Sequence, residues 1–328
     1  MSLADVSDPE PNLKELIEAL SRHPSVVEKA HIQTAYSPAA DVSGPVLLGD
    51  DCAAIPDEAT GGHLLFAAEG IISRFVEDDP WFAGYSAVMV NLSDVAAMGG
   101  TSIAITDILW CSESDHEKVD LIWDGMRAAS SAYGVPIVGG HTTRHSQPGD
   151  RVTLAAAVLG RAGPRLLTSF DAEVDDCLVI AVDTAGAYRK DKPFWNASTT
   201  SEPEKLRRLM GLLPKLAERG LCRAAKDISN GGIVGTLAMF TESSKVGALL
   251  DLDTLYRPRD TAWLKWLTSF PSFGYLLAIP AKHLTEVRAL FAPEPSVFVE
   301  SVGRFIEERS MIIAQGGELE NLQFPQMP

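Results

Sequence analysis

Residues 91–99 read Asn91-Leu92-Ser93-Asp94-Val95-Ala96-Ala97-Met98-Gly99 and close a predicted helix from about Phe82 to Met98. This helix is apolar nearly all round, which predicts burial on most of its faces. Asn91 and Asp94 are three residues apart and therefore share one face. A buried, ionised carboxylate costs several kcal/mol unless it is paired. Asp94 is therefore expected to meet a metal, a basic side chain or amide donors, or else to be a capped or salt-bridged structural residue.

Upstream of this helix, two adjacent carboxylates follow a short apolar stretch. The pattern predicts a strand at 46–48, a turn at Gly49-Asp50-Asp51 and a second strand at 64–68. Neighbouring carboxylates at the end of a strand repel one another unless a cation lies between them. A solvated Asp-rich turn is the alternative, because such turns are common.

Downstream of the helix, a second helix and a glycine pair follow. Ser114 and Glu117 form a capping-box pattern, apolar residues follow at helical spacing to Tyr133, and Gly134 is a stop signal. A strand at 135–138 then leads to Gly139-Gly140-His141-Thr142-Thr143, which we expect to form a turn closing that strand. Two residues without Cβ allow backbone amides to approach a ligand there. A further strand is predicted at 151–160.

The second half of the chain also mixes strands with helices. Strands are predicted at 177–182, 248–252, 274–279 and 297–302, and helices at 204–219, 262–267 and 282–291. Between them, Asp227 and Ser229 precede Gly231-Gly232 and an apolar helix start, where they serve either as caps or as phosphate ligands. These patterns predict an α+β (α/β) protein with an N-terminal arm at 1–44, domains at 45–165 and 166–310, and a C-terminal tail at 311–328.

Composition narrows the classes of function. The chain has 328 residues, 46% hydrophobic and 22% charged, with a formal net charge of -16. This acidic balance disfavours binding to nucleic acids or to anionic membranes, because both need clustered cations. The four cysteines form no CxxC pair, and no apolar run reaches the length of a membrane helix, so a cytoplasmic protein is expected.

Four segments, taken in order, resemble the aminoimidazole ribonucleotide synthetase-like ATP-binding superfamily. This superfamily includes thiamine-monophosphate kinase, selenophosphate synthetase and formylglycinamidine ribonucleotide synthase. The resemblance covers roughly residues 45–310 and rests on Gly49-Asp50-Asp51-Cys52-Ala53, residues 91–99, Gly139-Gly140-His141-Thr142-Thr143-Arg144 and Asp227-Ile228-Ser229-Asn230-Gly231-Gly232. The nearest local match is to thiamine-monophosphate kinase.

The resemblance implies a two-domain synthetase-like fold whose N-terminal sheet domain forms a homodimer interface. It implies ATP held with Mg²⁺ and transfer of a phosphoryl group to a small molecule. The metal ligands that it implies are Asp50, Asp51, Glu69, Asp94 and Asp227. The ATP contacts that it implies are Gly49, Asp51, Asp94, Gly139, Gly140, His141, Thr142, Arg161 and Ser229.

Two departures leave the activity open. His141 stands where the kinase has an acidic residue, and Asn230 replaces a second one. No catalytic residue is assigned, although His141 is a candidate. A nucleotide-binding regulatory dimer without turnover, and a divergent thiamine-monophosphate kinase, are the alternatives to an enzyme with another substrate.

A loop in the second domain suggests the nature of the substrate. Residues 188–196 place three cations and three aromatic residues within nine positions of an acidic protein. Clustered cations favour an anionic ligand, and an aromatic ring stacks on planar groups. Tyr188, Lys190, Lys192 and Trp195 are therefore the candidate contacts to an anionic small molecule. The alternative is a solvated loop with Trp195 packed against its own domain.

Overall fold

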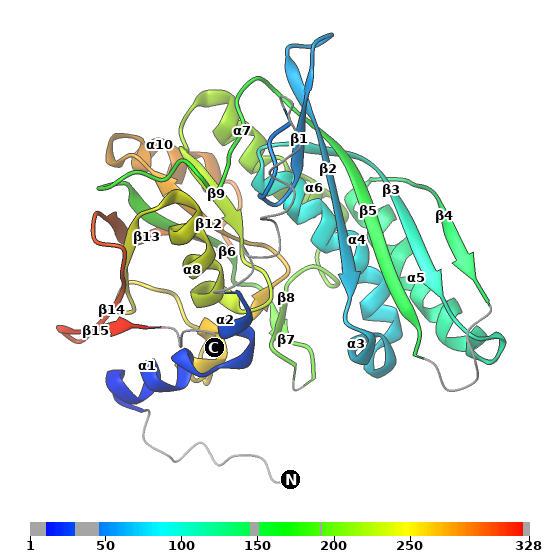
Figure 1. Cartoon of the computed structure of the whole chain (residues 1–328), viewed down its shortest axis with the longest axis horizontal. Coiled ribbons are helices and arrows are strands. Elements are labelled where there is room, and N and C mark those ends of the chain that lie inside the picture. Colours follow the sequence, from blue (N-terminus) through cyan, green and yellow to red (C-terminus); the bar gives the residue numbers. More distant parts are fainter. Residues whose placement is uncertain (1–10, 30–45, 145–150, 191, 324–328) are drawn as a thin grey trace. The chain divides into compact units, whose positions relative to one another are not determined.

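The chain folds into two compact units, each built on its own β-sheet. The computed structural model describes residues 11–29, 46–144, 151–190 and 192–323 (Figure 1). One unit, here called the five-stranded unit, comprises residues 43–167 and 198–220, and the other, the seven-stranded unit, comprises 1–42, 168–197 and 221–328. This mixture of sheets and helices confirms the predicted α+β class with two domains. Asp191, which lies in the predicted substrate loop, and parts of the arm and tail fall outside the described residues.

The five-stranded unit contains a mixed sheet whose order is β1-β2-β5-β3-β4. Neighbouring strands are antiparallel except for β3 and β4, which run parallel. The strands are β1 (Ala53–Asp57), β2 (Gly62–Ile71), β3 (Thr101–Trp110), β4 (Ile137–Thr143) and β5 (Thr153–Ala162). The helices are α3 (Ser73–Asp78), α4 (Pro80–Ala97), α5 (His116–Tyr133), α6 (Pro203–Met210) and α7 (Leu212–Arg219).

Helix α4 forms the core of this unit, as its apolar sequence predicts. It begins at Pro80 after the N-cap Asp79, and 15 of its 18 residues are buried. Its close neighbour is α5, and two glycines allow the approach: a Cβ at Gly84 would lie 2.0 Å from the Ile122 carbonyl oxygen, and one at Gly125 would lie 1.9 Å from that of Trp81. The residues that anchor Asp94 therefore belong to a tightly packed helix pair.

The seven-stranded unit has the sheet order β15-β14-β10-β13-β6-β12-β9 and a small sheet ordered β11-β8-β7. The strands are β6 (Cys177–Asp183), β7 (Ala187–Tyr188), β8 (Phe194–Asn196), β9 (Ala224–Asp227), β10 (Gly247–Asp251), β11 (Phe270–Pro271), β12 (Gly274–Ile279), β13 (Val297–Ile306), β14 (Met311–Gln315) and β15 (Glu318–Leu322). The helices are α1 (Leu13–Ser21), α2 (Pro24–Lys29), α8 (Gly232–Ser244), α9 (Trp263–Leu267) and α10 (Leu284–Phe291). One hydrophobic core joins α1, α2 and α8 to this sheet.

The predicted domain limits differ from these units in three places. Helices α1 and α2, from the predicted arm, pack in the seven-stranded unit, and β14 and β15, from the predicted tail, belong to its sheet. Residues 198–220 lie with the five-stranded unit, where Arg207 of α6 donates to the carbonyl oxygens of Ser131 and Ala132 at 2.8 and 3.1 Å. This segment forms two helices instead of the single predicted one: α6 ends at Met210, Gly211 caps it, and α7 begins at Leu212.

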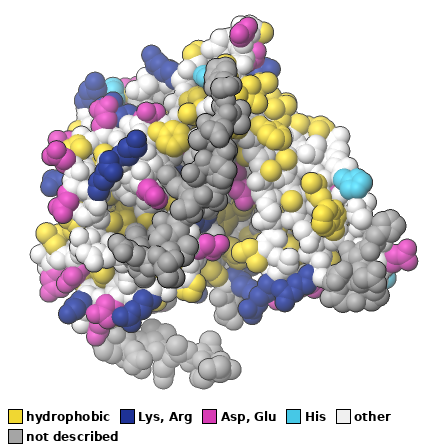
Figure 2. Space-filling model, in the orientation of Figure 1, with side chains coloured by type: hydrophobic (Ala, Val, Ile, Leu, Met, Phe, Trp, Pro, Cys, Tyr) yellow, Lys and Arg dark blue, Asp and Glu magenta, His cyan; other side chains and the backbone are white. Residues whose placement is uncertain are grey.

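One face of the five-stranded sheet is apolar and exposed. Phe66 of β2 pairs with Leu159 of β5, and Ile108 and Trp110 follow on β3 by strand alternation. These side chains are 38–54% exposed, and hydrophobic side chains gather over the strands of this unit in Figure 2. We call this the outer face, opposite to the face that α4 covers. Within the described residues, no helix combines the length and the hydropathy needed to cross a membrane.

Candidate functional site

The Gly49-Asp50-Asp51 turn has a defined local geometry. Gly49 has a φ of 89°, a left-handed conformation that favours glycine. The Asp50 Oδ1 accepts a hydrogen bond from the Asp51 backbone N–H at 3.0 Å. Instead of the predicted strand at 46–48, a single bridge between Leu47 and Ala54 closes across the turn, with both backbone hydrogen bonds at 3.0 Å. The Asp50 side chain thus shapes the turn that presents Asp51.

Helix α4 presents the second carboxylate. Asp94 is 7% exposed and Asn91, one turn earlier, is fully buried. The Asn91 Nδ2 donates to the Ala87 carbonyl oxygen at 2.8 Å. Its Oδ1 has no hydrogen-bond partner among the described residues. Leaving a buried amide oxygen without a partner costs about 1–3 kcal/mol, so an external donor or cation at this position would stabilise it.

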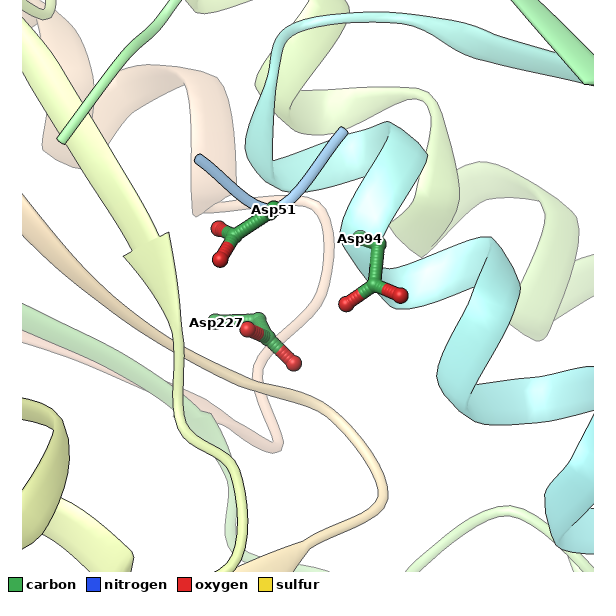
Figure 3. Close-up of side chains that lie close together, drawn as sticks. All are labelled: Asp51, Asp94 and Asp227. Atoms are coloured by element: carbon green, nitrogen blue, oxygen red, sulfur yellow. The ribbon is translucent and has the colours of Figure 1, made fainter. Parts of the chain in front are cut away.

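Asp51 and Asp94 come together within the five-stranded unit. One carboxylate oxygen of each lies within 4.8 Å of the other, and Figure 3 draws both side chains. At an effective dielectric constant of about 20, two like charges at that separation repel by about 3.5 kcal/mol. Carboxylate and amide oxygens are the donors that Mg²⁺ prefers. The donor chemistry of Asp51, Asp94 and Asn91 therefore fits a divalent, oxygen-seeking cation.

Asp227, also labelled in Figure 3, belongs to the seven-stranded unit. It is the last residue of β9, pairs with Tyr275 of β12 and is 4% exposed. Two residues later, the Ser229 N–H donates to the Thr236 Oγ1 at 3.2 Å, and the Ser229 carbonyl oxygen accepts from Gly232 at 2.9 Å. Ser229 therefore shapes the turn that leads into α8.

Several predicted site residues lie elsewhere in the five-stranded unit. The predicted turn at 139–142 is wrong. These residues, Gly139, Gly140, His141 and Thr142, lie inside β4. The parallel pairing with β3 continues past the glycine pair to Thr143, which explains the difference. Strand β4 is the sheet edge opposite to β1, the strand that follows Asp51. Within this chain, the segment at 139–142 therefore does not lie beside the Asp51 turn.

Arg161 and Glu69 lie on two neighbouring strands of the five-stranded sheet, β5 and β2. Arg161 is exposed on β5 and shares the outer face with Leu159, and His141 shares that face through its pairing with Ile108. Glu69 is exposed on β2, on the same face as Leu65. No carboxylate cluster among the described residues includes Glu69.

The loop predicted to contact the substrate is partly packed. Trp195 is 6% exposed and its Nε1 donates to the Asp183 carbonyl oxygen at 2.9 Å, so its ring belongs to the core and does not stack on a ligand, in contrast to the prediction. Tyr188 hydrogen-bonds Ser269 at 2.9 Å, and the Lys265 ammonium lies 3.9 Å from its ring centre. Of the four predicted contacts, Lys190 and Lys192 retain the character that the prediction needs, which is cationic charge in a loop.

Comparison with known proteins identifies relatives over most of the chain. Residues 49–162 match the AIR synthase related protein, N-terminal domain, and residues 177–314 match the C-terminal domain of the same family. An uncharacterised protein of Synechocystis is 46% identical over 83% of this chain and 82% of its own length. A protein of Methanocaldococcus jannaschii is 32% identical over 73% of each.

Solved structures share the fold at lower identity. Thermotoga maritima PurL complexed with ADP has a TM-score of 0.72 at 20% identity; 94% of this chain is covered, and it spans about half (52%) of PurL. A ThiL complexed with AMPPCP and TMP has a TM-score of 0.64 at 16% identity, with 86% of this chain and 91% of ThiL covered. A chain of a HypE–HypF complex has a TM-score of 0.69 at 16% identity, with 90% and 99% covered. With both domain matches and two relatives above 30% identity, the chain belongs to the AIR synthase related protein family.

Proposed function

We propose that this protein is a Mg²⁺-dependent, ATP-using enzyme that phosphorylates or phosphoryl-activates a small molecule. The observation that carries the proposal is the approach of Asp51 and Asp94 to within 4.8 Å. Asn91, one helical turn before Asp94 on α4, adds a buried amide oxygen without a hydrogen-bond partner among the described residues. Two carboxylates held this close are stabilised by a cation between them. PurL solved with ATP and ThiL solved with AMPPCP support a nucleotide as the companion of that cation.

In this proposal, Asp51 and Asp94 are the principal metal ligands, and Asp227, Glu69 and Asp50 are further candidates. Bound Mg²⁺ would neutralise charge on the phosphates during transfer. The chain contributes preorganisation, because the turn fixes Asp51 through the Asp50 carboxylate and the packed α4 fixes Asp94. Neither side chain must then be ordered when the nucleotide binds.

Calorimetric titration with ATP tests the binding part of the proposal. Dissociation constants should be at least tenfold lower with Mg²⁺ than with excess EDTA. Equal affinity in both conditions would contradict a metal-dependent site. Phosphate release, screened over a panel of small metabolites that includes thiamine monophosphate, tests turnover.

The same screen separates the two alternatives. Release with thiamine monophosphate alone would favour a divergent thiamine-monophosphate kinase. Tight Mg·ATP binding without release for any compound would favour a regulatory nucleotide-binding dimer. His141 and Asn230 are the residues behind these alternatives, because each replaces an acidic residue and so lowers the charge available to a metal.

We propose further that the substrate is anionic and contacts Lys190 and Lys192. Trp195 is removed from this proposal because it is packed in the core. The double variant Lys190→Ala, Lys192→Ala should keep its affinity for Mg·ATP and lose turnover with the true substrate. Equal loss of nucleotide binding would place the loop at the nucleotide, and no loss of either would remove its functional role.

A homodimer formed through the outer face is the final part of the proposal. Phe66, Ile108, Trp110 and Leu159 leave more apolar surface exposed on one sheet face than a solvated face needs. His141 and Arg161 lie on the same face, so a dimer formed there would also cover two of the predicted ATP contacts. A cytoplasmic location stays a prediction.

A further inference from the structure

A groove separate from the Asp51–Asp94 pair lies between β4 and α5. Its volume is about 690 Å³, within the range of about 300–1,000 Å³ that small-molecule sites occupy. Its floor is the edge strand β4, with Val138, Gly140 and Thr142, and its wall is α5, with Trp123 and Ser130. Both elements belong to the five-stranded unit.

Asp107 of β3 lines this groove and is deeply buried. The residue is 2% exposed, and neither carboxylate oxygen has a hydrogen-bond partner among the other described residues. Burial raises the pKa of this carboxyl group. It occupies a position between Ile105 and Leu109 where strand alternation calls for an apolar side chain. An acidic group at such a position destabilises the fold, and a ligand that pairs with it would offset that cost.

Gly140 makes the space for this carboxylate. It is the β4 residue paired with Asp107, and a Cβ there would lie 2.0 Å from the Asp107 Oδ1. Any larger residue at position 140 would displace the carboxylate. The glycine therefore keeps an acidic group at the floor of the groove.

The charges around the groove favour a cation. Arg127 is the other charged side chain of the lining within the described part of the chain, and its Nη2 lies 2.6 Å from the Asp124 Oδ1. Because the positive charge of Arg127 is paired with Asp124, the Asp107 carboxylate is the remaining unpaired charge among the described lining residues. Trp123, which is half-buried, adds an aromatic surface of the kind that attracts cations.

We propose that the β4–α5 groove binds a small organic cation whose nitrogen group, an amidinium, guanidinium or ammonium, donates hydrogen bonds to the Asp107 carboxylate beside Trp123. The aromatic wall and the single buried carboxylate suit a flat cation in particular, because one planar group can contact the ring and donate to the carboxylate. The Asp107 carboxylate is distinct from the proposed Mg²⁺ ligands, since it lies on β3 and not on the Asp51 turn or α4. Gly140 and Thr142 of the floor are also among the ATP contacts that the resemblance implies.

Benzamidine is the probe for this site, and benzamide, its neutral analogue, is the matched ligand control. Ligand-observed NMR with the full chain should show saturable binding of benzamidine with one site, at least tenfold tighter than benzamide. Asp107→Asn should weaken benzamidine binding at least tenfold. Glu58→Gln, which changes an exposed carboxylate in the β1–β2 turn at the opposite edge of the sheet, should leave it within about twofold.

Three results would overturn the proposal. These are benzamidine binding that does not saturate, equal affinity for benzamidine and benzamide, and equal affinity in the Asp107→Asn and unsubstituted chains. The benzamidine–benzamide comparison uses the unsubstituted protein, so it decides the matter even if Asp107→Asn fails to fold. Affinity for Mg·ATP, measured on the same samples, distinguishes failure here from failure of the proposed nucleotide site.

Discussion

The effect of Asp107 on the free energy of unfolding changes with pH in the direction opposite to that of a carboxylate paired with a cation. Its pKa is raised above the ordinary value of 3.8 by desolvation. The folded state therefore holds the proton more tightly than the unfolded state, and the resulting stability is fully present below about pH 3.8 and lost as pH rises through the folded pKa. Once ionised, the carboxylate thus destabilises the fold.

Asp107→Asn is expected to raise the midpoint of thermal unfolding at pH 7, because asparagine keeps a similar shape without a charge. The gain should shrink as pH falls, because the aspartate then takes up a proton and also loses its charge. Arg127, which forms an ion pair with Asp124 on α5, is left unchanged in both proteins because it is the charged side chain that also lines the groove. Thermal melts from pH 4 to pH 8 measure the difference, and a gain independent of pH would contradict this role for the charge.

The residues of the candidate site were partly predictable. Asp51 and Asp94 could be identified because each breaks a local pattern: a carboxylate pair after an apolar stretch, and a carboxylate in a helix that is apolar all round. Asp107 was missed, although it is a polar residue in an alternating apolar strand. Its importance depends on burial and on the absence of a pairing donor among the described residues, and neither property is visible in a sequence.

Among the elements, the α4–α5 pair holds Asp94 in place, and its close approach depends on glycine. Gly125→Ala would place a Cβ 1.9 Å from the Trp81 carbonyl oxygen, a backbone atom that cannot rotate away. Overpacking of this kind costs about 1–3 kcal/mol. Chemical denaturation should show that loss, and Mg·ATP affinity should fall with it if the position of α4 matters to the site.

Gly163→Ala is the matched control, because no atom lies within 4 Å of a Cβ built there. Its unfolding free energy should stay within about 0.5 kcal/mol of the parent chain, as surface substitutions generally do. If Gly125→Ala were equally neutral, the close helix packing would not be a source of stability.

Prediction of elements from the sequence succeeded where the hydrophobic pattern was long and failed where glycine carried the signal. Helix α4 begins within two residues of its expected start because nearly every position is apolar. The Gly139-Gly140 pair predicts a turn, but pairing with β3 keeps it extended, and Gly140 makes room for Asp107. That contact joins residues 33 positions apart, which no local pattern reports.

For the whole molecule, the outer face gives the most direct test of assembly. Light scattering at micromolar concentration should give about twice the chain mass of 35.3 kDa. Ile108→Asp should shift the protein to the monomer, because it places a charge at the centre of the apolar face. Leu121→Asp, at an exposed apolar residue of α5, should leave the mass unchanged. A monomeric parent chain would refute the dimer.

Domain organisation at this scale could be predicted as two mixed units but not in its details. The sequence order suggested consecutive domains, whereas residues 198–220 pack with the five-stranded unit and α1 and α2 pack with the seven-stranded one. Such exchanges depend on contacts between distant segments, such as that between Arg207 and the end of α5. Charge and hydropathy along the chain do not report them.

A double-mutant cycle tests most directly whether Asp51 and Asp94 share one metal in the binding of ATP. Mg·ATP affinity is measured calorimetrically for the parent chain, Asp51→Asn, Asp94→Asn and the double variant, with Asp124→Asn as control. Residues that act on one ligand are strongly coupled. Each single variant should lose at least tenfold in affinity, about 1.4 kcal/mol, and the double variant should bind within about threefold of the weaker single one. Unchanged affinity in either single variant, or losses that add fully in the double variant, would contradict the shared metal.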